Sequence, residues 1–211
     1  MAQILKEEVR DRIISSAREE FLKRDYEQAN MRSIALRSRM TVGNLYRYFR
    51  SKEELNRFIV APAYGKINQL IKDLTAQQIS LEQLHGPLNL SVEELKQMLD
   101  TLGDRLVDIF EEHHTELLIL MMHSNLNQSI RSWFADAIHD LILPRFPFES
   151  EEASRTISLA YATSIFEGLK KMFTDQPLPS KTLKRLVKIY LDSYIQILEK
   201  ADFSRFHKET L

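Results

Sequence analysis

Residues 40–55 read MTVGNLYRYFRSKEEL, and this stretch decides the fold of the N-terminal part of the chain. Thr41 is a residue type that caps helix N-termini, so we predict a helix from Val42 to about Phe49. Ser51, followed three residues later by Glu54, has the capping-box pattern that starts a further helix. Because these two helix starts are close together, the first of the two helices must be short.

A second short helix is predicted directly before this stretch. Asn30 can cap a helix over residues 31–38, whose apolar residues recur at three- and four-residue steps. Residues 39–41 would then join two helices of roughly two to three turns, which is the size of a helix-turn-helix unit. Together with an amphipathic helix predicted over residues 5–24, these elements make a three-helix N-terminal domain.

The second short helix can present its exposed face to a DNA major groove, which is about 12 Å wide and admits one helix. The side chains on that face are Val42, Gly43, Asn44 and Arg47. Asn44 is the best direct reader of a base edge among them, because a side-chain amide can donate and accept hydrogen bonds together.

The charge distribution supports a nucleic-acid partner that the net charge of -1 conceals. Residues 1–60 hold 13 Lys and Arg against 9 Asp and Glu, a net of +4, and the rest of the chain has a net of -5. Aromatic residues are interleaved with the cations, and tyrosine hydroxyls can add hydrogen bonds to phosphates. A solvated basic face on an ordinary helical hairpin would carry similar charges, but the spacing, caps and aromatics together favour DNA.

The rest of the chain is also predicted to be helical, because five Gly, six Pro and no sustained strand-like alternation leave an all-α fold of about nine helices. Pro62 should bend or divide the fourth helix, and the polar stretch 75–90 is predicted to be a loop. The further helices are expected at about residues 52–74, 91–110, 114–123, 126–143, 151–174 and 180–200.

The quoted stretch resembles the DNA-binding signature of TetR-family transcriptional regulators. The pattern Gly-x-Leu-Tyr-x-Tyr-Phe-x-Ser-Lys-Glu-Glu-Leu from Gly43 to Leu55 is specific, and the match extends over roughly residues 9–55, about a quarter of the chain. Beyond it, only the length and the helix count agree.

The resemblance implies roles for individual residues. It implies that Thr41, Tyr46, Tyr48 and Lys52 contact phosphates, that Asn44 contacts a base or the groove, and that Gly43 lets the helix approach closely. Leu45 and Phe49 are expected in the core. Arg39 stands where the family commonly has Gly, so a left-handed conformation there would cost about 1–2 kcal/mol, which a phosphate contact by Arg39 could offset.

The resemblance also implies that a larger C-terminal helical domain dimerises through its last two helices and binds a small molecule. Small and apolar residues recur along both helices, and intramolecular packing would give the same periodicity. The dimer-interface candidates are Ile157, Ala160, Tyr161, Ser164, Ile165, Gly168, Leu186, Tyr190, Tyr194 and Ile197.

A partly apolar inducer is expected in this domain, because adaptable Met and broad aromatic side chains suit such a ligand. Each candidate taken alone fits an ordinary core better than a ligand site. The candidate lining residues are Tyr64, Phe110, Met121, Met122, His123, Trp133, Phe134 and Phe166.

Several classes of protein are excluded or disfavoured. The absence of Cys removes disulfides, thiol nucleophiles and Cys-ligated zinc. The four His between His113 and His139 include no His-x-x-x-His pair, and no acids and bases with catalytic spacing occur, so we expect no metal, no cofactor and no enzyme. The N-terminus lacks the apolar core of a signal peptide, and residues 117–122 are too few to span a bilayer; a cytoplasmic protein without a membrane partner is expected.

The sequence therefore predicts a dimeric, sequence-specific DNA-binding transcriptional regulator, a repressor that a small molecule releases from double-stranded operator DNA. We expect the DNA-binding domain in residues 1–50 and the ligand-binding and dimerisation domain in residues 51–211, linked through the helix at about 52–74. A small helical enzyme and a protein-binding adaptor are the alternatives.

Overall fold

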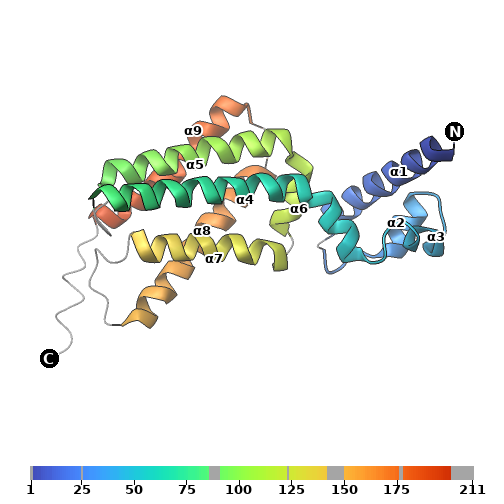
Figure 1. Cartoon of the computed structure of the whole chain (residues 1–211), viewed down its shortest axis with the longest axis horizontal. Helices are drawn as coiled ribbons and strands as arrows, with labels where there is room; N and C mark the ends of the chain where they lie inside the picture. Colours follow the sequence, from blue (N-terminus) through green and yellow to red (C-terminus); the bar gives the residue numbers. More distant parts are fainter. Residues whose placement is uncertain are drawn as a thin grey trace. The chain divides into compact units, whose positions relative to one another are not determined.

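The computed structural model describes residues 2–24, 26–85, 91–122, 124–141, 150–175 and 178–200. Within these ranges the chain forms nine α-helices and no strand, which confirms the all-α prediction (Figure 1). The helices are α1 (Ala2–Lys23), α2 (Met31–Arg37), α3 (Val42–Tyr46), α4 (Lys52–His85), α5 (Val92–Glu112), α6 (His114–Met122), α7 (Ser124–Leu141), α8 (Glu151–Thr174) and α9 (Ser180–Lys200).

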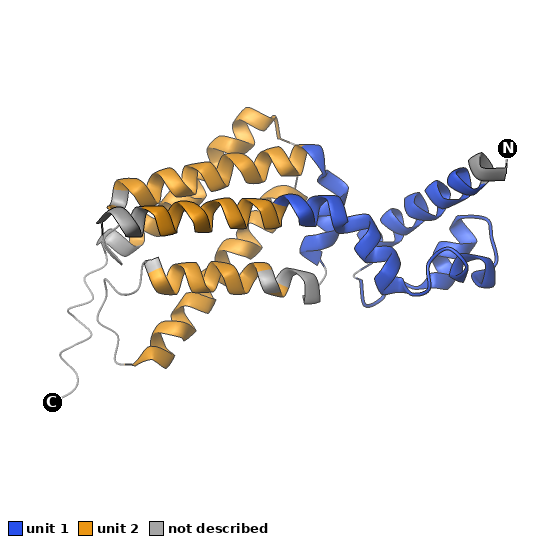
Figure 2. Ribbon diagram, in the orientation of Figure 1, with its two compact units in different colours: residues 1–66, 112–127 blue, residues 67–111, 128–211 orange. Residues whose placement is uncertain are grey.

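The helices group into two compact units (Figure 2). The first unit comprises residues 1–66 and 112–127, and the second comprises residues 67–111 and 128–211. The long helix α4 contributes its first half to one unit and its second half to the other. These units are defined by packing, whereas the predicted boundary at residue 50 divides the chain by function and stays a prediction.

The first unit is built around α1, which packs against α2 and α6. Its core consists mainly of fully buried apolar side chains, because α1, α2, α3 and α4 each turn one apolar face inward. Leu45 and Phe49 belong to this core, as expected from the sequence. The largest of these side chains are Ile13, Phe21, Ile34, Leu45, Leu55 and Ile59.

Local caps place the two short helices as predicted. The side chain of Asn30 accepts a hydrogen bond from Ser33 N at 2.8 Å, and Thr41 Oγ1 accepts one from Asn44 N at 3.2 Å. However, α3 ends at Tyr46 and not near Phe49. Residues 47–49 tighten into a turn, because Tyr48 N donates to Leu45 O three residues back at 2.9 Å.

The helix α4 is longer than predicted. It runs without interruption through Pro62, and it continues to His85, so the predicted loop is wrong for residues 75–85. Leu74 is buried in the second unit, and residues 75–85 consist mostly of the good helix formers Ala, Gln, Leu and Glu, so packing and propensity both extend the helix. Residues 86–90 lie outside the described residues. The capping box that starts α5 is confirmed, with Glu94 N donating to Ser91 Oγ at 3.2 Å.

The second unit contains the second half of α4 with α5, most of α7, α8 and α9. The helices α8 and α9 contact each other, and their apolar faces are buried at Phe166, Leu169, Val187 and Leu191. Two ion pairs join α5 to α9: Lys184 with Asp108 and Lys188 with Asp104. The predicted helix end at Pro144 and Pro147 lies outside the described residues. None of the described helices is long and apolar enough to cross a membrane.

Candidate nucleic-acid interface and ligand cavity

The turn between α2 and α3 is a Schellman motif. Met40 N donates to Ala35 O at 2.9 Å, and Arg39 N donates to Leu36 O at 3.1 Å, which are the two hydrogen bonds that define this helix ending. The motif requires a left-handed residue after the C-cap, and Arg39 has a φ of 57° there. The turn therefore has the conformation in which a non-Gly side chain is strained.

A basic groove lies beside this turn in the first unit. It is lined by side chains from α1, from the turn, from α3 and from the two residues that follow α3. Among the described lining residues, no carboxylate opposes its four cations. We call it the basic groove. Its lining residues are Lys6, Val9, Arg12, Arg39, Met40, Thr41, Asn44, Arg47 and Tyr48.

The groove brings together most of the residues predicted to bind DNA. Thr41, Asn44 and Arg47 are exposed, and Tyr48 is half-buried. Gly43 and Tyr46 are also exposed on α3, and a Cβ built on Gly43 would meet nothing within 4 Å. The surface around α3 is therefore open to an approaching partner.

Sequence reasoning missed two cations of the basic groove, Lys6 and Arg12. They share one face of α1 with Val9, because three-residue steps separate the three residues. That spacing was visible in the sequence. The sequence does not show that α1 lies beside α3, and only the folded unit places Lys6 and Arg12 next to that helix.

Lys52, predicted to reach a phosphate, has three backbone neighbours. Its Nζ donates to Tyr26 O at 2.7 Å and to Ala29 O at 3.1 Å, lies 3.4 Å from Glu27 O, and sits 4.3 Å from the centroid of the Tyr26 ring. The Tyr26 hydroxyl in turn donates to Glu53 at 3.0 Å. Burial and this hydrogen bond raise the pKa of Tyr26. An ammonium has three donors, so a phosphate would compete with these carbonyl oxygens.

We expect Lys52→Met to lower the free energy of unfolding by about 1–3 kcal/mol, because hydrogen bonds from a charged donor are lost. Thermal or urea unfolding measures this. The salt dependence of DNA binding should stay unchanged. Lys66→Met is the matched control, since Lys66 pairs with Glu112 at 3.2 Å between exposed side chains, and such pairs contribute about 0–1 kcal/mol. A shallower salt slope with unchanged stability would instead assign Lys52 to a phosphate.

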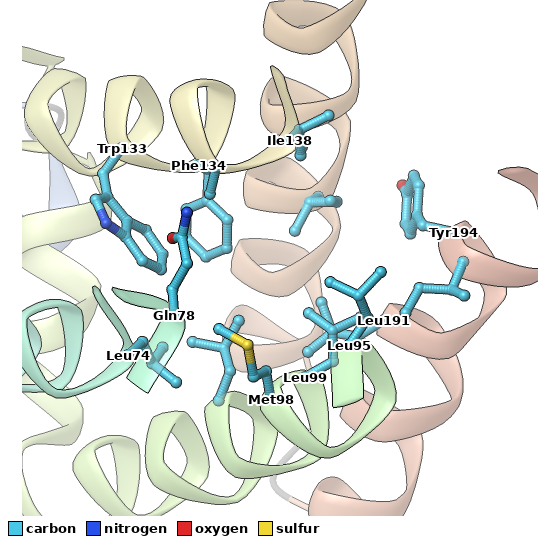
Figure 3. A pocket seen from close by; sticks show the side chains of 14 residues that line it. Leu74, Gln78, Leu95, Met98, Leu99, Trp133, Phe134, Ile138, Leu191 and Tyr194 are labelled. Carbon is cyan, nitrogen blue, oxygen red and sulfur yellow. The ribbon is translucent and has the colours of Figure 1, made fainter. Parts of the chain in front are cut away.

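A separate apolar cavity of about 90 Å³ lies within the second unit (Figure 3). Side chains from α4, α5, α7, α8 and α9 converge on it. Its lining residues are Leu74, Gln78, Leu95, Met98, Leu99, Leu102, Trp133, Phe134, Ala137, Ile138, Ile165, Leu191, Tyr194 and Ile195.

The structure distributes the predicted pocket residues over different places. Trp133 and Phe134 line the cavity, whereas Phe166 is buried in the core, and Phe110 stacks on Phe173 with 4.4 Å between ring centroids. Tyr64, Met121 and Met122 belong to the first unit, and His123 lies outside the described residues.

The α5 side of the cavity was missed, although its residues follow a helical spacing. Leu95, Met98, Leu99 and Leu102 fall at i, i+3, i+4 and i+7. Periodicity shows which face of a helix is buried and not whether a cavity remains there, so this spacing alone predicts only a helix with one apolar face.

The predicted dimer-interface residues form one group that is accessible in the single chain and a second group that packs within the chain. Several side chains on α8 and α9 are exposed or half-buried in the single chain, whereas Ile165 is buried and lines the cavity. Tyr190 lies against Gly168 and Tyr194, within the chain. The first group comprises Ile157, Ala160, Tyr161, Ser164, Leu186 and Ile197, and Leu159 and Ile189 are exposed beside them.

Three N-terminal helices with a capped two-helix motif, a Schellman turn and a basic groove are typical of helix-turn-helix DNA-binding proteins. Residues 13–57 match the family model described as "Bacterial regulatory proteins, tetR family". The N-terminal part of the chain is therefore similar to the DNA-binding domain of TetR-family transcriptional regulators.

Solved structures show the same fold along most of the chain. A TetR-like transcriptional regulator from Rhodococcus sp. RHA1 is 14% identical, with a TM-score of 0.55 over 89% of this chain and 96% of that one. A TetR family transcriptional regulator from Chloroflexus aurantiacus J-10-FL is 15% identical, with a TM-score of 0.56 over 92% of this chain and 93% of that one. No curated protein sequence matches the chain.

Proposed function

We propose that the chain is a dimeric, sequence-specific transcriptional repressor that leaves its operator when a small molecule binds residues 51–211. The observation that carries the proposal is the basic groove, which brings together four cations from α1, from the turn and from the C-terminal end of α3 with the exposed amide of Asn44. Cations at this spacing suit phosphates, and the amide suits a base edge. Residues 1–50 are the proposed DNA-binding domain.

Within this proposal, the exposed side chains of α3 and its turn have distinct roles. Thr41, Tyr46 and Tyr48 hydrogen-bond phosphates, and Arg39 and Arg47 neutralise them. Gly43 lets α3 approach the major groove of DNA closely, because it has no side chain and the space around its Cα is open. Lys52 stabilises the DNA-binding domain by donating hydrogen bonds to carbonyl oxygens of the loop before α2.

A dimer is proposed because one recognition helix reads only a half-site. Two half-sites lie about 34 Å apart on one face of DNA, so a symmetric dimer must hold two copies of α3 at that spacing. The exposed apolar side chains on α8 and α9, among them Leu159, Leu186, Ile189 and Ile197, support these helices as the contact surface.

Release by a ligand is proposed because the second unit holds an apolar cavity whose walls come from five helices. A ligand that binds more tightly to one spacing of the two recognition helices shifts the population toward that spacing. The ratio of its affinities for the two states limits how much operator affinity it removes.

Retention of DNA from the gene's own promoter region tests the proposal. The purified protein should retain this DNA at low salt in the presence of competitor DNA, and Asn44→Ala should change the sequence preference at one position of each half-site by about 1–3 kcal/mol. Gln77→Ala, an exposed amide of α4, is the matched control and should change nothing. No retention at low salt would contradict the proposal and leave a protein-binding adaptor.

A further inference from the structure

The apolar cavity of the second unit has a composition that restricts its ligand. Among the described residues that line it there is no charged side chain, and most of the wall is Leu, Ile, Met and aromatic carbon. Placing an ion in such surroundings without a partner has a large desolvation cost. The cavity therefore selects against both anions and cations.

All three polar side chains in the wall interact with the protein, and Trp133 and Tyr194 use their polar atoms in the following hydrogen bonds. Trp133 Nε1 donates to Thr75 Oγ1 at 3.3 Å. The Tyr194 hydroxyl lies 2.7 Å from Ser164 Oγ and 2.8 Å from the Tyr190 hydroxyl. With these partners in place, Trp133 and Tyr194 offer ring surfaces to the cavity.

Gln78 is the third polar side chain, and it extends from α4 toward the side of the cavity formed by Trp133 and Phe134 (Figure 3). A carboxamide has two donor hydrogens and two acceptor lone pairs, so it can bind a ligand in addition to its protein neighbours. It can therefore recognise one polar group on an otherwise apolar molecule.

The size of the cavity sets a second limit. A volume of about 90 Å³ is smaller than the apolar cavity of about 150 Å³ that binds benzene in an engineered protein. A molecule of one ring therefore needs the wall to adjust, which the flexible side chain of Met98 allows. Larger polycyclic ligands would require the helices to separate.

The geometry points to a neutral, compact ligand of about one ring, with a single polar group that hydrogen-bonds to Gln78. This inference rests on the proposed function, because it names the chemical class of the inducer. It goes beyond that function in excluding charged inducers and in assigning the one side chain that reads the polar group.

Three probes of nearly equal shape test the selection against charge: benzyl alcohol, benzoate and benzylammonium. Trp133 is the one Trp in the sequence and lines the cavity, so its fluorescence reports occupancy without a label. Benzyl alcohol should change the emission saturably, and the affinity for each of the two ions should be lower by at least about 100-fold. Equal or tighter binding of either ion, or no saturable change with benzyl alcohol, would overturn the inference.

Gln78→Leu tests the assigned hydrogen bond. It should lower the affinity for benzyl alcohol by about 5–10-fold and leave toluene within about twofold, because only the alcohol uses the amide. An equal loss for both probes would show that Gln78 only shapes the wall, and this part of the inference would fail. Calorimetric titration gives both affinities independently of fluorescence.

Ala137→Leu tests whether the ligand occupies this cavity, since the added carbons fill part of it. Ala135→Leu is the matched control, because two residues along a helix is about 200° around its axis, and Ala135 is not in the wall. Binding should be lost in the first variant and kept in the second, with circular dichroism confirming that both fold. Retained binding in Ala137→Leu would place the ligand elsewhere.

Ligand binding is measured without DNA, and promoter retention is measured without ligand, so the two proposals fail separately. Retention of DNA with no binding of benzyl alcohol overturns the assigned ligand class and leaves the regulator. Binding of benzyl alcohol with no retention of DNA contradicts the regulator and leaves a neutral-ligand site.

Discussion

Gly168→Ala is expected to lower the free energy of unfolding by about 2–4 kcal/mol, because overpacking and a broken hydrogen bond act together. A Cβ on Gly168 would lie 2.0 Å from the hydroxyl oxygen of Tyr190. That hydroxyl donates to Ser164 O at 2.7 Å and, having one hydrogen, accepts from Tyr194 at 2.8 Å. The ring cannot withdraw without giving up both bonds.

Gly65→Ala is the matched control for this prediction. Gly65 is also inside a helix, and a Cβ there would meet nothing within 4 Å. The same substitution should therefore stabilise the protein by about 0.5–1 kcal/mol through helix propensity. Urea unfolding at fixed protein concentration measures both variants.

Protein concentration separates two explanations of a loss at Gly168. The clash with Tyr190 is within one chain, so the loss should be the same at all protein concentrations. A loss that shrinks as concentration rises would mean that Gly168 acts in a dimer contact, because dimerisation stabilises by mass action. Unchanged or increased stability in Gly168→Ala would contradict the observed position of the Tyr190 ring.

Local signals made the first part of the fold predictable. Asn30, Thr41 and Ser91 each cap a helix through a backbone group three residues away, so the sequence contains both partners of the hydrogen bond. Arg39 and Arg47 were recognisable for the same reason, since they lie within one short stretch, whereas Lys6 and Arg12 on α1 were not. The helix-turn-helix unit follows from interactions of this range.

Interactions between distant residues were not predictable from the sequence. The extension of α4 to His85 depends on packing in the second unit, and the cavity depends on five helices that leave space between them. The contact of Gly168 with Tyr190 joins two helices whose relative rotation the periodicity leaves undetermined. The small-residue steps of α8 suggested a dimer surface, although at Gly168 the space is taken by the chain's own tyrosine.

Arg39→Gly is expected to change stability and DNA affinity in opposite directions. Arg39 occupies the left-handed position of the Schellman turn with a φ of 57°, so Gly should stabilise the protein by about 1 kcal/mol. The same change removes a cation from the basic groove. In a dimer two phosphate contacts are lost, which should lower operator affinity by about 30-fold at about 0.15 M salt and make the slope of log K against log salt shallower by about 2.

Arg39→Ala separates the two effects, because it removes the charge and keeps the strained backbone. It should lose as much operator affinity as Arg39→Gly and gain no stability. Thermal unfolding and a salt titration of operator binding measure the two quantities on the same samples. If Arg39→Gly gains stability and keeps full affinity, the arginine makes no phosphate contact, and the strain has no compensation in DNA binding. If both variants lose affinity with an unchanged salt slope, the guanidinium reads a base and not the backbone, because only phosphate neutralisation releases counterions.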